Sequence, residues 1–165
     1  MTPVVEMSVE SKLWDSMIDL RRTIDASIAA ASENCGKMLS ENCEISLLLC
    51  DDSSIKKINR EWRGIDKATN VLSFPVPGKL DQKALLGDIV IAFETTRAEA
   101  LEEGKSLNDH FSHLLVHGFL HLLGFDHETD GEAEEMETME RLILMKLAIA
   151  DPYSGAALAE GLGLK

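Results

Sequence analysis

The sequence predicts a single α+β domain, with about four strands in a mixed sheet and helices packed on it. Its 165 residues suffice for one ordinary domain, and a composition of 45% hydrophobic and 27% charged residues is typical of globular proteins. The four expected strands lie before Glu94, with one early helix between the first two, and three helices follow them. This order favours a mixed sheet over strictly alternating units. We expect one domain over residues 1–150 and a flexible tail over 151–165, which is rich in glycine and alanine.

Patterns in the first third of the chain predict two strands and a helix. Residues 4–9 form a short β-branched run typical of a strand. Ser11 can cap an amphipathic helix that we expect to end near Gly36, because apolar residues recur at steps of three and four. The compact apolar run 43–50 predicts a buried strand.

The rest of the domain is predicted from caps, prolines and glycines. Residues 51–54 offer caps for a short helix that Gly64 closes. Pro75 ends the next strand because proline cannot donate to a ladder, and Gly104 and Gly124 end helices. The expected strands are 70–74 and 86–93, and the expected helices are 94–103, 107–123 and 131–149.

Cysteine usage and the N-terminus bear on the class of protein. The three cysteines, Cys35, Cys43 and Cys50, lack a C-x-x-C spacing, which argues against a disulfide framework and a cysteine zinc site. The N-terminus lacks the regions of a secretion signal, and no stretch approaches about 18 uninterrupted apolar residues. We therefore expect a cytoplasmic protein with no membrane partner.

The histidines form the strongest functional signal. All five lie between His110 and His127. His117 and His121 are four residues apart, so on a helix they project from one face, and Gly124 allows a turn that returns His127 as a third ligand. Three neutral nitrogens suit Zn²⁺ and leave a position for water, so we predict a catalytic metal site at this helix end and turn. A polar helix face and a closed structural zinc site are the alternatives.

Neighbouring residues can support that site. His113 can contact a ligand or serve in packing, and we expect His110 at the surface. Asp126 can orient an imidazole or carry a proton, but it can equally be a turn residue that satisfies backbone donors. Gly118 occupies the position where H-E-x-x-H peptidases need glutamate, which disfavours a peptidase and indicates a close backbone approach.

A second cluster of chemistry-bearing residues lies upstream, on the short helix and just after it. Its five basic residues are Lys56, Lys57, Arg60, Arg63 and Lys67. Such a face is usually just solvated, but Arg63 precedes Gly64 at a helix end, where a guanidinium can offer a fork to a phosphate. We expect Trp62 to be a core anchor in preference to a base-stacking platform.

These residues carry a resemblance to a known family. The strings HGFLHLLGFDH (117–127), NREWRGIDKATNVLSFP (59–75) and LGDIVI (86–91) resemble the bacterial YbeY family of metal-dependent, single-strand-specific endoribonucleases, and the match runs from about residue 4 to 150. The resemblance implies a role in 16S rRNA 3′-end maturation and ribosome quality control. It also implies one zinc ion, or another divalent transition metal, on His117, His121 and His127, with Arg63 as the functional arginine.

The resemblance has one departure, because members of the family usually carry aspartate where this chain has Asn70. The candidate substrate-binding residues are Lys57, Arg60 and Asp88, although Asp88 can equally make a hydrogen bond at a strand start. The implied partners are single-stranded RNA, rRNA and the small ribosomal subunit or its proteins, and no DNA. The alternatives are a non-catalytic ribosome-assembly factor with a structural metal and, less favoured, a metallopeptidase.

The charge distribution limits how RNA can be bound. The net charge of −13 argues against a uniformly basic surface that grips nucleic acid. Residues 53–83, however, carry seven basic and three acidic residues, whereas residues 128–140 carry seven acidic residues and no basic one. We therefore predict weak, local and salt-sensitive contact with RNA.

Overall fold

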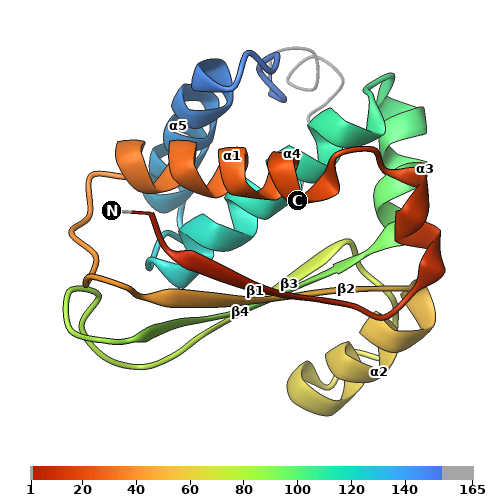
Figure 1. The fold of residues 1–165 in the computed structure, drawn as a ribbon, viewed down its shortest axis with the longest axis horizontal. Coiled ribbons are helices and arrows are strands. Elements are labelled where there is room, and N and C mark those ends of the chain that lie inside the picture. Colours follow the sequence, from red (N-terminus) through yellow and green to blue (C-terminus); the bar gives the residue numbers. More distant parts are fainter. Residues whose placement is uncertain (1, 154–165) are drawn as a thin grey trace.

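The computed structural model describes residues 2–153, which fold into one four-stranded sheet with helices on both faces (Figure 1). The elements in chain order are β1 (Val4–Val9), a short 3-10 helix η1 (Lys12–Ser16), α1 (Leu20–Asn34), β2 (Glu44–Cys50), α2 (Asp52–Arg63), β3 (Val71–Pro75), β4 (Leu85–Ala92), α3 (Phe93–Glu103), α4 (Leu107–Leu122) and α5 (Asp130–Lys146). Of the expected tail, the part from residue 154 onward lies outside the described residues.

The sheet is mixed, as predicted. Its strand order is β1-β2-β4-β3, with β1, β2 and β4 parallel and β3 antiparallel to β4 at one edge. The β3–β4 ladder runs from the Val71–Ile91 pair to the Pro75–Gly87 pair, so the strand ends at the proline that cannot donate to a ladder. The prediction of a single α+β domain with helices on a mixed sheet is confirmed.

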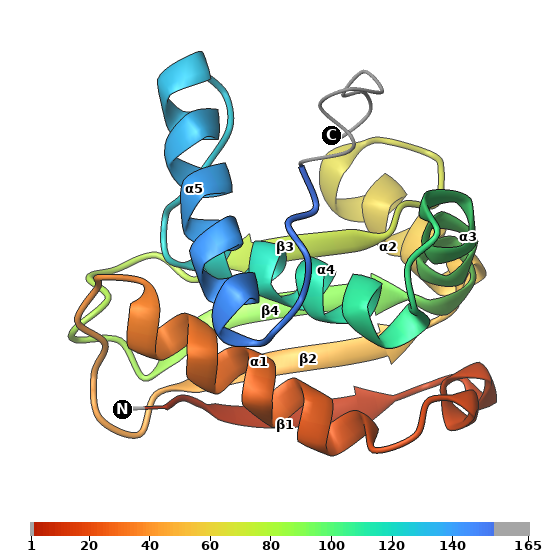
Figure 2. The ribbon, with the colours of Figure 1, turned by 90° about the horizontal axis from the view of Figure 1, so that it is seen from above.

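Most of the core lies between the sheet and the helices above it. Seen from above, α1 crosses over β1 and β2, while α4 runs over β4 and β3 (Figure 2). Ile24 and Ile28 of α1 and Phe119 of α4 are fully buried in this core, together with Ile45 and Ile89 of the sheet. A smaller cluster fills the opposite face, where α2 lies below the sheet (Figure 1).

The predicted single helix from Ser11 to Gly36 is wrong at its start. Ser11 caps only the 3-10 helix, and α1 begins at Leu20 after Asp19, which adopts a left-handed conformation with φ 55°. The cause is Trp14, which is 1% exposed, donates its indole N–H to the Cys50 carbonyl at 2.9 Å and contacts Phe93 and Phe111 edge-on. Holding Trp14 in the core at the end of β2 requires the chain to turn before the helix begins.

Gly87 allows the end of α4 to lie close to the sheet. Its φ is +151°, and a Cβ at this position would lie 2.4 Å from the Phe74 carbonyl oxygen and 2.7 Å from Leu122. Only glycine fits such an approach. Strands β3 and β4 therefore meet the last turn of α4, which carries His121.

Within residues 2–153, none of the helices has the length and apolar character needed to cross a bilayer. All three cysteines are buried free thiols.

Candidate metal centre

Three histidines converge where α4 ends, and we call them the three-histidine group: His117, His121 and His127. One ring nitrogen from each lies within 4.8 Å of the others. His117 and His121 project from successive turns of α4, and their Nε2 atoms are 3.2 Å apart. The rings of His117 and His127 are nearly parallel with centroids 5.8 Å apart. The structure thus brings together the three residues that the spacing predicted.

The turn after α4 places the third histidine. Gly124 adopts φ +101°, and the Phe125 amide bonds back to the Leu120 carbonyl at 3.1 Å, which reverses the chain. Phe125 is buried and fixes the turn against the core. Asp126 Oδ1 accepts the His127 backbone N–H at 2.8 Å, which is the contact expected of a turn residue.

The geometry and chemistry of the three-histidine group fit a transition metal such as zinc. With zinc–nitrogen bonds of about 2.0–2.1 Å, neighbouring nitrogens around a tetrahedral ion lie about 3.3–3.4 Å apart, close to the 3.2 Å between His117 and His121. Burial, and then the charges of His117 and His127, lower the pKa of His121 to about 4. At neutral pH the His121 imidazole is therefore uncharged and has a lone pair available for an ion.

Glu140 of α5 contacts the three-histidine group through His117. Its side chain is 1% exposed, and its carboxylate lies 2.6 Å from His117 Nδ1 and 2.8 Å from His113 Nε2. Burial alone would raise the pKa of Glu140, but hydrogen bonds from His113 and His117 hold it well below its usual range. The ionised carboxylate accepts a hydrogen bond from His117 Nδ1–H, which leaves Nε2 free to face the other histidines.

Sequence reasoning missed Glu140 by treating residues 128–140 as an acidic outer surface. The signal was present in the register of α5. Glu140 lies four residues after Met136 and three or four before Ile143 and Leu144, all of which are buried. An acidic residue on the apolar stripe of a helix indicates a buried partner, because an unpaired buried charge is costly.

His113 and Tyr153 complete the contacts of this carboxylate. Burial lowers the pKa of His113 even though Glu140 opposes that shift. The Tyr153 hydroxyl donates to Glu140 Oε1, and burial followed by the Glu140 charge raises the pKa of Tyr153. His113 therefore reaches the three-histidine group through Glu140, and its ring centroid lies 6.3 Å from that of His117.

The expected surface position of His110 is wrong. His110 is 3% exposed, and its Nε2 lies 2.8 Å from Glu99 of α3. Asn70 meets the same carboxylate, since its Nδ2 donates to the two Glu99 oxygens at 3.0 and 3.2 Å while its Oδ1 accepts the Val71 amide. Asn70 thus links the start of β3 to α3, a structural function that needs the amide it carries here.

Gly118 allows α4 to lie close to the sheet, as its mid-helix position predicted. Ser73 Oγ of β3 donates to the Gly118 carbonyl at 3.0 Å. A Cβ on Gly118 would lie 3.0–3.3 Å from Ser73, Ile89 and Val71. The edge strand β3 therefore packs directly against the turn of α4 that carries His117.

The basic candidates lie on the other side of this strand. Arg63 is the last residue of α2, and Arg63, Lys57 and Arg60 are all exposed. Arg60 lies 4.0 Å from Asp66. Within residues 2–153, no hydrogen bond or ion pair joins Arg63 to the three-histidine group.

Asp88 is not brought to the histidines. It is exposed and alternates with Ile89, whose side chain faces Gly118 of α4. Because neighbouring residues of a strand point to opposite faces, Asp88 points away from α4. The neighbouring Val90, which shares that face, belongs to the cluster under α2.

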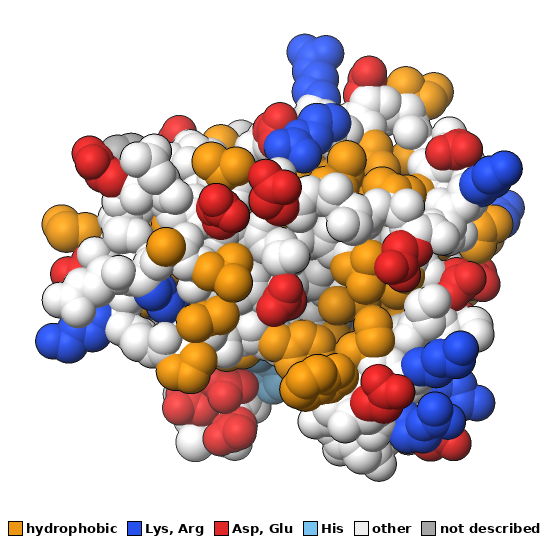
Figure 3. Space-filling model, turned by 60° about the horizontal axis from the view of Figure 1, so that its bottom comes forward, with side chains coloured by type: hydrophobic (Ala, Val, Ile, Leu, Met, Phe, Trp, Pro, Cys, Tyr) orange, Lys and Arg blue, Asp and Glu red, His pale blue; other side chains and the backbone are white. Residues whose placement is uncertain are grey.

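The expectation that Trp62 anchors the core is wrong, because Trp62 is 73% exposed. Its ring centroid lies 6.3 Å from that of Phe74 in β3. Figure 3 shows the face that includes α2, with histidine surface visible low in the view. Acidic side chains lie to the left of this surface, hydrophobic side chains lie to its right, and basic side chains lie farther right.

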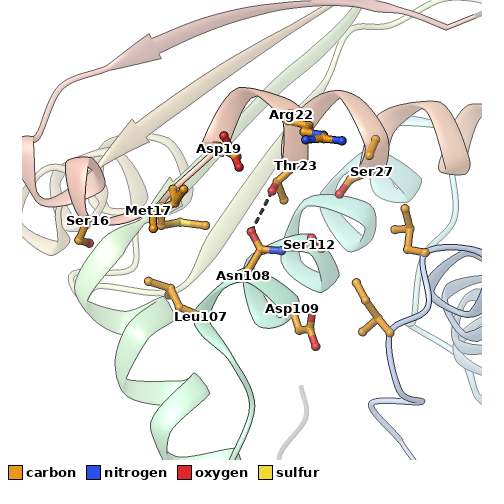
Figure 4. Close-up of a pocket in the computed structure, with 14 residues that line it drawn as sticks. Ser16, Met17, Asp19, Arg22, Thr23, Ser27, Leu107, Asn108, Asp109 and Ser112 are labelled. Carbon is orange, nitrogen blue, oxygen red and sulfur yellow. Dashed lines mark hydrogen bonds between the residues drawn. The ribbon is translucent and has the colours of Figure 1, made fainter.

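A separate pocket of about 600 Å³ lies between the starts of α1 and α4 (Figure 4). Its lining includes Thr23 and Asn108, which are joined by a 2.8 Å hydrogen bond. None of the predicted site residues lines it, and it adjoins the opposite end of α4 from His121.

Comparisons with known proteins identify the family and the fold of the chain. A family model described as "Endoribonuclease YbeY" matches residues 8–148. Curated proteins named "Endoribonuclease YbeY" are similar: one from Methylocella silvestris is 48% identical over 93% of this chain and 87% of its own, and one from Beijerinckia indica is 51% identical over 95% and 80%. A solution structure of a Thermotoga maritima protein, 20% identical over 90% of this chain and 98% of its own, shares the fold with a TM-score of 0.53.

Proposed function

Since the chain belongs to the YbeY family of endoribonucleases, we propose that it is a zinc-dependent, single-strand-specific endoribonuclease. Its site of action is the 3′ end of 16S rRNA in the cytoplasm, during maturation and quality control of the small ribosomal subunit. The observation that carries the proposal is the convergence of His117, His121 and His127 at the end of α4.

The accessibility of the three-histidine group supports catalysis over a purely structural metal. His127 is exposed and His117 and His121 are half-buried. A structural zinc site is closed by four protein ligands, whereas a catalytic one keeps a position for water or substrate. A zinc ion held here would polarise a phosphate oxygen or lower the pKa of a water molecule.

The chain's own residues prepare the site for that chemistry. Glu140 holds the His117 ring by its Nδ1 proton and so directs Nε2 toward His121. His113 shares the same carboxylate and thereby limits its movement. Asp126 fixes the turn that presents His127.

Arg63 is the proposed catalytic cation. Its exposed guanidinium ends α2 beside the edge of the sheet and can neutralise charge that develops on phosphoryl oxygens. Lys57 and Arg60 precede it on the same helix, where both are exposed. They would hold flanking phosphates, Lys57 as a point charge and Arg60 through its planar fork of donors. Asp88, which faces away from α4, is the weakest member of the proposed substrate-binding set.

Cleavage of single-stranded RNA tests the proposal. Highly purified wild type, His117→Ala and Arg63→Ala are incubated with a labelled single-stranded RNA and with the same strand in a duplex. We expect wild type to cut only the single strand, and both variants to lose at least about 100-fold in rate, as is usual when a metal ligand or charge-stabilising group is removed. Equal cleavage by all three proteins would indicate a contaminating nuclease and reject the enzyme in favour of an assembly factor.

A further inference from the structure

Trp62 is the large aromatic side chain that packing leaves unexplained. It is 73% exposed, whereas Trp14, the other tryptophan, is 1% exposed. Trp62 lies in the last turn of α2 next to Arg63, and its ring is tilted 55° to that of Phe74, with centroids 6.3 Å apart. An exposed indole gains little free energy from folding, and tryptophan is enriched at binding interfaces, so this side chain is a candidate contact for a ligand.

The aromatic pair, Trp62 and Phe74, is joined to the metal centre through β3. Phe74 follows Ser73, whose hydroxyl donates to the carbonyl of Gly118, the residue after His117. Ser73 and Phe74 face opposite sides of the sheet because neighbouring strand residues alternate. The aromatic pair therefore lies just around the exposed edge of β3 from the three-histidine group.

Charge indicates the kind of ligand that fits beside this pair. The basic residues of α2 and its following loop are all exposed: Lys56, Lys57, Arg60, Arg63 and Lys67. Acidic side chains gather instead over the start of α5, across the histidine surface in Figure 3. An aromatic face next to exposed cations matches a nucleic acid strand whose bases are free to stack while its phosphates are neutralised.

We propose that Trp62, supported by Phe74, is a stacking platform for an unpaired base of the RNA strand that is cut at the three-histidine group. This inference rests on the proposed function and deepens it. A base in a duplex is already stacked and paired, so it cannot lie on Trp62 without being extruded. The platform therefore contributes to the choice of single strands over duplexes.

Binding measurements test the platform directly. The probe is a fluorescein-labelled 2′-O-methyl oligouridine, whose integrity is checked on a gel, and its anisotropy is titrated with zinc-loaded protein at low salt. The variants are Trp62→Ala and Trp62→Phe. The matched control is Leu101→Ala, which removes a side chain that is 72% exposed on α3. The melting temperature of each protein confirms that it is folded.

Removing the indole should weaken binding by about 10- to 100-fold, which corresponds to the usual value of one base–aromatic stack. Trp62→Phe should stay within a few-fold of wild type, and Leu101→Ala should match it. Tryptophan fluorescence of the wild type should be quenched on binding, because Trp14 is buried and Trp62 reports the contact. Affinity of Trp62→Ala equal to that of Leu101→Ala would overturn the platform.

Cleavage separates this failure from failure of the proposed function. If wild type and Trp62→Ala cut single-stranded RNA with the same KM, the proposed endoribonuclease function is supported and the stacking platform is rejected. If wild type neither binds nor cuts the strand, the proposed function itself is rejected. A higher KM with a nearly unchanged kcat in Trp62→Ala would support both.

Discussion

Glu140 is the single residue on which the geometry of the three-histidine group depends most. Its buried carboxylate touches His117 and His113 and accepts the Tyr153 hydroxyl. A neutral amide of the same shape can no longer attract the Nδ1 proton as strongly, so the His117 ring loses its fixed orientation.

We expect Glu140→Gln to weaken zinc binding by about 10- to 100-fold, the usual effect of losing a group that orients a metal-binding histidine. Competition with a chromophoric chelator measures the change. Glu134→Gln, an exposed substitution on the same helix, is the control and should bind zinc as wild type does. Equal affinity in the two variants would show that Glu140 does not orient His117.

Two half-buried histidines, His113 and His121, also make the metal-free protein sensitive to acid. The pKa of His121 is lowered to about 4, chiefly by burial, and that of His113 is lowered as well. As the pH falls below about 6.5, His113 and His121 take up protons in the unfolded chain but stay neutral in the folded protein. The free energy of unfolding therefore falls. Glu140, whose pKa is also lowered, adds to the loss below its ordinary value of 4.5.

The melting temperature of the metal-free protein should therefore decrease steadily from pH 7 to pH 4. Differential scanning calorimetry in chelator measures it. His121→Asn removes one of the responsible groups and should flatten the curve between pH 6.5 and pH 4. A melting temperature that is constant over this range in wild type would contradict the neutral state of these histidines.

At the scale of elements, the site depends on how closely α4 approaches the edge of the sheet. Gly87 and Gly118 permit that approach from β4 and from α4. At Gly87 the atoms that a Cβ would meet include backbone of Phe74 and Pro75, at 2.4 and 2.9 Å, which cannot move aside like a flexible side chain.

Gly87→Ala should lower the free energy of unfolding by about 3 kcal/mol or more, because overpacking and an unfavourable positive φ act together. Urea unfolding measures the change. Gly131→Ala is the control, since its Cβ would meet nothing within 4 Å, and it should leave stability unchanged or slightly higher because alanine favours helix α5. A similar midpoint for both variants would mean that the contact between β3, β4 and α4 is loose.

Element types were predictable wherever local pattern and tertiary packing agree. The apolar run 43–50 and the proline-ended strand 70–74 form the expected strands, and the histidine spacing identified the three-histidine group before any fold was known. The prediction of one helix from Ser11 failed because burial of Trp14 overrides the helical period.

Side-chain environment was harder to predict than element type. Trp62 was expected in the core and is exposed, whereas His110 was expected at the surface and is buried. Such outcomes depend on which face of a helix meets the rest of the protein, a long-range property that spacing along the chain does not contain. For Glu140, the apolar stripe of α5 did indicate a buried partner, but it could not identify the partners, which lie on α4, 23 and 27 residues earlier.

At the scale of the whole molecule, the net charge of −13 hides a local reversal. The segment 53–83 is net positive, and its basic residues on α2 are exposed near the edge strand β3. The acidic residues at the start of α5 repel RNA elsewhere. Few phosphates can therefore be neutralised at once.

Binding of single-stranded RNA should weaken by about ten- to twenty-fold between 50 and 200 mM salt, as expected for about three phosphate contacts. Fluorescence anisotropy at a series of salt concentrations measures the slope. Lys57→Ala should reduce that slope by about 0.7, the share of one phosphate contact on a single strand. Tight binding to arbitrary naked RNA at physiological salt would contradict a small local contact surface.

The central claim is that His117, His121 and His127 hold one metal ion that this protein needs to cut RNA. Titration of the chelator-treated protein with zinc, followed by the rate of single-stranded RNA cleavage, tests it most directly. We predict no cleavage without metal and a rise that ends at one equivalent of zinc, with no rise in His127→Ala. Full cleavage by the metal-free protein, or the same titration curve in His127→Ala, would contradict the claim.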